Sequence, residues 1–141
     1  MRTFETRTEE ETIALAAQLA SAWVPPCVVL LIGNLGAGKT TFAKGVASGI
    51  GAARPEDVSS PTFPLIHEYG EDGEMYHIDL YRLDTREEVE TLGLDELFAR
   101  PSIVLLEWAE RFPELLPENR LEIRIEARED DTRHIELTEL P

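Results

Sequence analysis

The sequence predicts a three-layer α/β fold with a mostly parallel central sheet and an antiparallel hairpin near its C-terminal end. Two apolar runs, residues 27–32 and 102–108, have the character of parallel strands that are buried on both faces. Helical patterns lie before and between these runs, as they do around βαβ units. Residues 121–126 alternate apolar and charged side chains, which indicates a strand with one solvated face, and residues 133–137 return as its hairpin partner.

Length and composition favour a single cytoplasmic domain. The chain has 141 residues, enough for one domain with its own hydrophobic core, so we expect residues 1–141 to form a single unit. The lone cysteine, Cys27, cannot form an internal disulfide and suits a reducing compartment. No signal-peptide pattern opens the sequence and no apolar run approaches membrane-spanning length, so we expect a cytoplasmic protein without a membrane partner.

The negative charge limits the partners that the surface would attract. With 28 acidic and 13 basic residues, the net charge is −15. Such a surface repels phosphodiester backbones, which argues against strong direct binding of nucleic acid. A basic patch on a partner protein would be complementary, although acidity that merely keeps the protein soluble explains the charge equally well.

The N-terminal region is predicted to contain an edge strand and a helix. Residues 2–7 alternate weakly and fit the strand. Thr8 and Glu11 have capping-box spacing, and apolar residues then follow helical spacing as far as Trp23. Pro25 and Pro26 end this helix and lead into the first buried strand.

A glycine-rich motif follows the first buried strand directly. Residues 33–40, GNLGAGKT, fit the pattern G-x-x-x-x-G-K-[ST], and residues 41–50 continue as a helix. Strand, loop and helix in this order direct backbone amides and a helix N-terminus towards phosphate oxygens. Gly36 and Gly38 allow a close approach, Lys39 would meet the β- and γ-phosphates, and the Thr40 hydroxyl would bind Mg²⁺. We therefore expect a P-loop NTPase-like fold that binds a nucleoside triphosphate.

The segment after this helix has two interpretations. Residues 58–64 contain too much proline for a central strand. A loop with Ser and Thr at this place in the chain is where a nucleotide-sensing segment would lie, with a hydroxyl that reaches Mg²⁺ only in the triphosphate state. An ordinary proline turn explains the same residues.

Two acidic residues are predicted to lie near the phosphates. Residues 65–69 and 75–81 fit two strands joined by a turn, and Asp79 lies in the second, where a buried carboxylate requires a cation or hydrogen-bond donors. The alternative is a carboxylate paired with Arg82. Glu107 ends the second apolar run, at the strand end where ligands of open α/β sheets bind and where a Walker B acid holds Mg²⁺. The alternative is a surface glutamate.

We expect His67 and His77 to make structural hydrogen bonds rather than to ligate metal.

Four stretches carry a resemblance to a known family. They are GNLGAGKTTFAKG, SPTFPLIHEY, YHIDLYRL followed by LGLDELF, and LLEWAE. Together they resemble the TsaE (YjeE) family of small bacterial P-loop ATPases, over nearly the whole chain. The combination of SPTF and H-x-D-L-Y-R with the P-loop makes the resemblance specific. Asn34 stands where the family usually shows Asp, and Ala109 where Pro usually follows the Trp; neither departure removes a phosphate or magnesium ligand.

The resemblance implies a function and a set of site residues. The expected protein is a Mg²⁺-dependent ATPase, weak alone and stimulated by its partners TsaB and TsaD. TsaD transfers a threonylcarbamoyl group to the adenosine beside the anticodon of transfer RNAs that read codons beginning with A, so contact with transfer RNA would be indirect. The implied catalytic residues are Asp79, Lys39 and Thr62, the Mg²⁺ ligands are Thr40 and Glu107, and the further nucleotide contacts are Glu9, Leu35, Gly36, Ala37, Gly38, Thr41, Trp108 and Arg133.

Two other functions remain open from the sequence. A small-molecule kinase would also use a P-loop, although no insertion here carries the clustered arginines of a closing lid. A nucleotide-gated interaction module that does not hydrolyse ATP would need only one of the two acids. A Ras-like GTPase is disfavoured because the sequence has no N-K-x-D motif.

Overall fold

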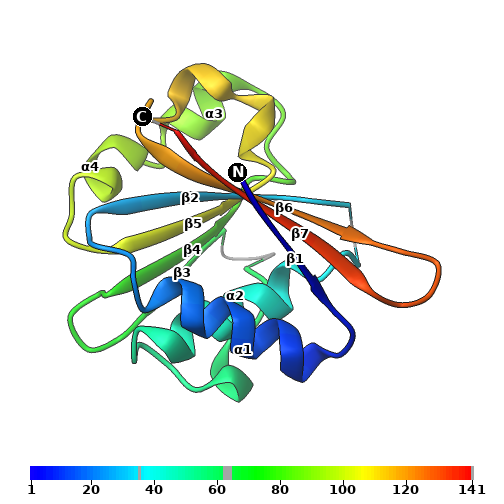
Figure 1. The fold of residues 1–141 in the computed structure, drawn as a ribbon. Helices are drawn as coiled ribbons and strands as arrows, with labels where there is room; N and C mark the ends of the chain where they lie inside the picture. The colour runs from blue at the N-terminus through cyan, green and yellow to red at the C-terminus, as the bar shows by residue number, and fades with distance from the viewer. Residues whose placement is uncertain (35, 62–64, 141) are drawn as a thin grey trace.

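The computed structural model describes residues 1–34, 36–61 and 65–140, and it contains a seven-stranded sheet covered by helices on both faces (Figure 1). The strands follow the order β1-β7-β6-β2-β5-β4-β3 across the sheet. Their bounds are β1 (Arg2–Thr6), β2 (Cys27–Ile32), β3 (Ile66–Tyr69), β4 (Met75–Asp79), β5 (Ile103–Glu107), β6 (Arg120–Ala127) and β7 (Arg133–Leu140). The helices are α1 (Glu9–Ala20), α2 (Lys39–Gly49), α3 (Arg86–Glu90) and α4 (Leu94–Phe98), with 3₁₀ segments η1 (Pro55–Asp57), η2 (Ala109–Arg111) and η3 (Pro113–Leu115).

The sheet is mixed, so the prediction of a mostly parallel sheet is only partly right. The four central strands β6, β2, β5 and β4 run parallel, whereas β1–β7, β7–β6 and β4–β3 pair antiparallel. Short turns join β3 to β4 and β6 to β7, and a short turn permits only antiparallel pairing. The C-terminal hairpin is confirmed, and residues 2–6 form the edge strand that the sequence predicts.

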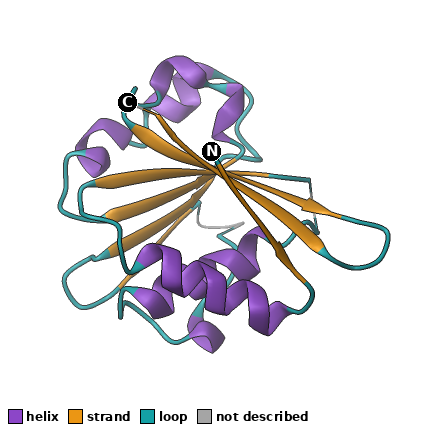
Figure 2. Ribbon diagram, in the orientation of Figure 1, coloured by secondary structure: helices purple, strands orange, loops and turns teal. Residues whose placement is uncertain are grey.

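Two hydrophobic cores lie on the two faces of the sheet. Helices α1 and α2 cover one face, and α3, α4 and the 3₁₀ segments after β5 cover the other (Figure 2). The first core contains Leu105, and the strand register places His77 beside Leu105 and Asp79 beside Glu107. Because side chains alternate along a strand, His77, Asp79 and Glu107 all lie on the α1–α2 face. The fold therefore brings the two predicted acids to the side of the sheet where the helix after the P-loop begins.

Close packing joins α1 to α2. A Cβ atom on Gly45 would lie 2.6 Å from Ala16 Cβ, and one on Gly49 would lie 2.7 Å from Ala17 Cα, so each position requires glycine for the observed approach. Such contacts leave no room for even a methyl group. The start of α1 is thereby held against the helix that follows the P-loop.

Helix α3 begins with a capping box, and the predicted capping box at the start of α1 is present in one of its two hydrogen bonds. The Thr85 capping box is complete, with both reciprocal hydrogen bonds present. At α1, Thr8 accepts a bond from the Glu11 amide at 3.1 Å, but the Glu11 carboxylate accepts from the Arg7 amide at 2.9 Å instead of from Thr8. Within the ranges that the structure describes, no helix combines the length and apolar character needed to cross a membrane.

Candidate nucleotide-binding site

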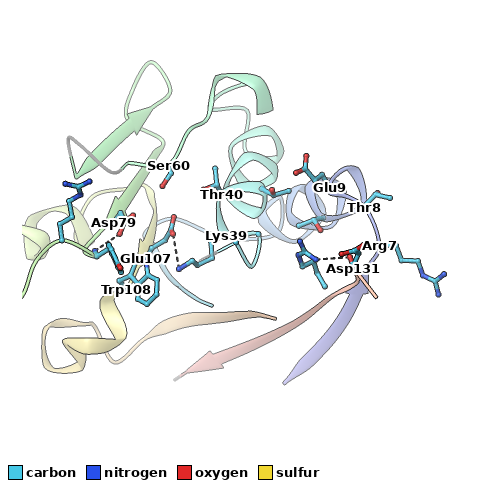
Figure 3. Close-up of a pocket in the computed structure, with 17 residues that line it drawn as sticks. Arg7, Thr8, Glu9, Lys39, Thr40, Ser60, Asp79, Glu107, Trp108 and Asp131 are labelled. Carbon is cyan, nitrogen blue, oxygen red and sulfur yellow. Dashed lines mark hydrogen bonds and ion pairs between the residues drawn. The ribbon is translucent and has the colours of Figure 1, made fainter. Parts of the chain in front are cut away.

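A cavity of about 720 Å³ lies where β4 and β5 end and α2 begins (Figure 3). Five parts of the chain line it: the start of α1, the glycine-rich loop with α2, the segment before β3 that contains Ser60, the ends of β4 and β5 with their loops, and the turn between β6 and β7 with the start of β7. The lining residues are Arg7, Thr8, Glu9, Thr12, Gly36, Gly38, Lys39, Thr40, Thr41, Ser60, Asp79, Tyr81, Arg82, Glu107, Trp108, Asp131 and Arg133.

Almost all of the predicted site residues that the structure describes line this one cavity. The exception is Ala37, which is buried and lines a neighbouring cavity of about 580 Å³. Leu35 and Thr62 lie outside the described residues, although Ser60 of the same segment as Thr62 lines the cavity. The cavity brings the predicted residues together, while their roles stay predictions.

The described residues of the glycine-rich loop, 33, 34 and 36–40, adopt a backbone conformation that depends on glycine. Gly36 and Gly38 both have positive φ, 81° and 112°, which favours glycine, and Gly38 caps α2. A Cβ on Gly33 would lie 2.6 Å from the carbonyl oxygen of Ile125, so the loop approaches β6 closely. The first-turn amides of α2 begin at Lys39, and no acidic side chain lies in that turn. Unpaired amides and a positive helix end favour phosphate at this point.

Lys39 is held between an acid and an aromatic ring. Its side chain is buried, with Nζ 3.7 Å from Glu107 Oε1 and 3.9 Å from the ring centroid of Trp108 (Figure 3). Trp108 adopts a left-handed backbone conformation, φ 64°, and its ring also contacts Tyr81 at a centroid distance of 5.0 Å. A non-glycine residue in this conformation costs roughly 1–3 kcal/mol. The turn at Trp108 thus sets the indole beside the ammonium group that we expect to meet phosphate.

Asp79 is buried at the end of β4 and faces the cavity. Burial raises the pKa of its carboxyl group above the usual range, and nearby Glu107 adds to this effect, while the Tyr81 amide, at 2.8 Å from Oδ1, and Lys39 oppose it. The alternative of an Asp79–Arg82 pair is not what the structure contains: in its described part, no ion pair joins these two residues, and Arg82 lines the cavity separately.

Two further residues support the site. His77 makes the structural hydrogen bond that the sequence predicts, although its partner was not predicted, and Arg111 was not predicted at all. His77 is fully buried, and its Nε2 lies 2.5 Å from Glu107 Oε2, so its hydrogen bond goes to the predicted Mg²⁺ ligand. The Arg111 guanidinium donates to the carbonyl oxygens of Leu80 and Leu83, the latter at 2.8 Å, and its Nε donates to that of Trp108 at 3.4 Å. Arg111 therefore ties the loop after β4 to the loop after β5. His77 opens the H-x-D-L-Y-R stretch, but nothing in the sequence indicates its contact with Glu107 or the contacts of Arg111, because these contacts join segments that are distant in the chain.

The oxygen donors in the cavity fit Mg²⁺ only together with phosphate. Among the described residues, no group of three or more His, Cys, Asp or Glu side chains could hold a metal ion. Thr40 and Glu107 both line the cavity and supply a hydroxyl and a carboxylate oxygen. Mg²⁺ in nucleotide sites is commonly held by one or two protein oxygens, phosphates and waters. The residues present match that pattern.

Comparisons with known proteins agree with one another. The profile of the family described as Threonylcarbamoyl adenosine biosynthesis protein TsaE matches residues 6–135. The chain is 48% identical over 131 residues to the tRNA threonylcarbamoyladenosine biosynthesis protein TsaE of Bacillus subtilis, covering 92% of this chain and 80% of that protein. The protein of the same name from Haemophilus influenzae is 46% identical over 111 residues, covering 78% and 68%.

A solved structure gives the same result for the fold. The crystal structure of YdiB from Bacillus subtilis superimposes with a TM-score of 0.81 at 40% identity, covering 99% of this chain and 86% of that chain. The family profile extends from residue 6, the last residue of β1, to residue 135 in β7, and the relative from Bacillus subtilis and the superposition cover 92% and 99% of the chain. The chain therefore belongs to the TsaE family, which takes part in tRNA threonylcarbamoyladenosine biosynthesis.

Proposed function

We propose that this chain is a Mg²⁺-dependent ATPase with a P-loop NTPase-like fold, which supports threonylcarbamoyl transfer to the adenosine next to the anticodon of transfer RNAs that read codons beginning with A. The observation that carries the proposal is the convergence of Lys39, Thr40, Asp79 and Glu107 on one cavity at the start of α2. These are a cation for phosphate, a hydroxyl for the metal and two acids, from three separate parts of the sequence. Membership of the TsaE family supports the same reading.

Each residue has a role that its surroundings support. The amides at the start of α2 and the Lys39 ammonium bind the phosphates. Thr40 and Glu107 would hold Mg²⁺, which would neutralise negative charge on the phosphates. Asp79 orients the attacking water: it lies beside Glu107 in the strand register and is the acid whose pKa burial raises. A carboxyl group with a raised pKa is suited to proton exchange with water.

The proposed partners are the TsaD and TsaB proteins, in a heteromeric complex. A chain of net charge −15 complements a basic protein surface and repels transfer RNA, so contact with RNA is through the complex. Phosphoryl transfer depends on positioning and charge stabilisation. The basic side chains that line the cavity, apart from Lys39, are Arg7, Arg82 and Arg133. A partner that positions the Ser60 hydroxyl, or that adds a cation, would accelerate hydrolysis.

The test is steady-state ATPase activity at near-physiological salt, with the protein alone, with transfer RNA only, with TsaB and TsaD only, and with both. We expect slow hydrolysis by the protein alone and acceleration by the partner proteins. Full activity alone, or strong stimulation by transfer RNA without partners, would contradict the proposal.

The same assay separates the remaining alternatives. Phosphate transferred to an acceptor instead of water would identify a small P-loop kinase. Tight ATP binding without turnover in any mixture would identify a nucleotide-gated interaction module.

A Glu107→Ala variant should weaken the magnesium dependence of nucleotide binding, because it removes one of the two proposed ligands.

A further inference from the structure

Beneath the cavity, the buried ring of His77 contacts the proposed magnesium ligand. Nε2 lies 2.5 Å from Glu107 Oε2. Among the described residues, the other ring nitrogen, Nδ1, has no hydrogen-bond partner. A carboxylate oxygen accepts a hydrogen bond, so the ring donates through Nε2, and this assigns the tautomer with a bare Nδ1.

The two carboxylate oxygens of Glu107 have different surroundings. Oε1 lies 3.7 Å from Lys39 Nζ and belongs to the cavity side, where Figure 3 draws the contact as a dashed line. Oε2 is taken by His77. The terminal torsion of a glutamate is broad and otherwise allows the carboxylate to turn. A hydrogen bond to one oxygen fixes this torsion and keeps the other oxygen aimed at the cavity.

The donor itself is rigid. His77 lies on β4 between two neighbouring strands, paired with Leu105 of β5 and with His67 of β3. Its side chain is fully buried. An aliphatic side chain would fill this position without leaving Nδ1 unpaired, and an unpaired buried polar atom is unfavourable. Packing alone therefore does not account for a histidine here, whereas the bond to Glu107 does.

We infer that His77 is a positioning residue for Mg²⁺: it holds the Glu107 carboxylate so that Oε1 faces the metal–nucleotide complex. The inference rests on the proposed function, since it concerns the metal that accompanies ATP. Hydrogen-bond partners of metal ligands typically change metal affinity by about 10- to 100-fold when they are removed. His77 acts through Glu107 and does not contact the nucleotide.

The experiment compares His77→Leu with His77→Gln in the full chain. Binding of a fluorescent derivative of the non-hydrolysable analogue AMPPNP is followed by anisotropy during a Mg²⁺ titration, and again in EDTA. We expect His77→Leu to raise the Mg²⁺ concentration for half-maximal binding about tenfold, with unchanged affinity in EDTA. His77→Gln should stay near the wild type, because its amide nitrogen can replace Nε2 as the donor.

The chain offers a matched control in another histidine–glutamate pair. His134 Nε2 lies 3.3 Å from Glu136 Oε1. Ile135 and Leu137 of the same strand belong to the core under α1 and α2, so His134 and Glu136 lie on the opposite face of the sheet. His134→Leu should leave the Mg²⁺ titration unchanged.

A Glu107→Gln background tests whether His77 acts through Glu107. His77→Leu should add no further loss of Mg²⁺ dependence there, and an added loss of full size would overturn the inference. An unchanged titration for His77→Leu, or an equal loss in EDTA, would also overturn it. If the Leu variant does not fold, His77→Asn replaces it, because its shorter amide cannot reach Glu107 and should show the same loss. A wild-type chain that does not bind nucleotide would instead refute the proposed function.

Discussion

Replacing Lys39 by alanine should lower the free energy of unfolding of the protein in the absence of nucleotide. At 3.7 Å, the attraction between the Lys39 and Glu107 charges is about 4.5 kcal/mol for an effective dielectric constant of 20. Removing one member of a buried pair typically costs about 3–5 kcal/mol. We expect a fall of about 3 kcal/mol in the free energy of unfolding, at the low end of that range, because His77 still donates to Glu107. For a chain of this size, the melting temperature should drop by roughly 10 °C.

The same substitution should weaken nucleotide binding. Loss of a charge-assisted hydrogen bond to phosphate costs roughly 1.5–3 kcal/mol, or about ten- to a hundred-fold in affinity. Isothermal titration with AMPPNP at saturating Mg²⁺ measures this change. Lys44→Ala is the matched control, since it removes the same charge from the same helix at a residue that does not line the cavity.

Three results would refute parts of the reasoning for Lys39. Unchanged AMPPNP affinity in Lys39→Ala would contradict the assignment of residues 33–40 as a phosphate-binding loop. An equal loss in Lys44→Ala would mean that binding responds to total charge and not to this ammonium group. An unchanged melting temperature would show that the contact with Glu107 does not stabilise the fold.

Three further predictions concern other parts of the site. Burial raises the pKa of Asp79, so over the pH range between its unfolded and folded pKa the folded chain keeps a proton that the unfolded chain has lost. The contribution of this group to the free energy of unfolding is therefore greatest at low pH and falls as pH rises through the folded pKa. Asp79→Asn should therefore melt at a higher temperature than the wild type at pH 7, although it should lose ATP hydrolysis. The difference in melting temperature should shrink towards pH 4. A lower melting temperature than the wild type at pH 7 would contradict this prediction. Gly45→Ala should lower stability by about 0.5–2 kcal/mol in denaturant titrations, because overpacking against α1 outweighs the gain in helix propensity, and an equal or higher midpoint would mean that α1 moves freely. Nucleotide should change the fluorescence of Trp108 as phosphate draws Lys39 from its ring, so Trp108→Phe should abolish the signal and Trp23→Phe should keep it.

The parts of the site that lie on local patterns could be predicted from the sequence. The glycine motif and its flanking strand and helix occupy one continuous stretch, so their geometry follows from neighbouring residues. Glu107 could be placed because an acid that ends a buried strand lies at the ligand-binding edge of the sheet. Glu9 and Arg133 depended on the resemblance to the family, since nothing in their own surroundings indicates a site.

Features that depend on strand pairing could not be predicted from the sequence. The donor to Glu107 is His77, 30 residues earlier in the chain, and only the register of β4 beside β5 brings them together. Arg111 is tied to the loop after β4 by the same juxtaposition of the two strands. Which strand pairs are parallel and which are antiparallel also depended on the strand order. β6 pairs in parallel with β2, and β7, the hairpin partner of β6, pairs with β1 at the edge of the sheet.

The pairing of β1 with β7 has a consequence for how the protein matures on the ribosome. Among the strands of the described residues, β1 is synthesised first and β7 last, yet Arg2 lies opposite Leu137 in the register. Translation proceeds at about 5–20 residues per second, so β1 must wait on the order of ten seconds for its partner. Asp131 and Arg133, which line one side of the cavity, are synthesised equally late. A nascent chain that has already formed its glycine loop and α2 therefore still lacks one side of the nucleotide site until the final hairpin leaves the exit tunnel.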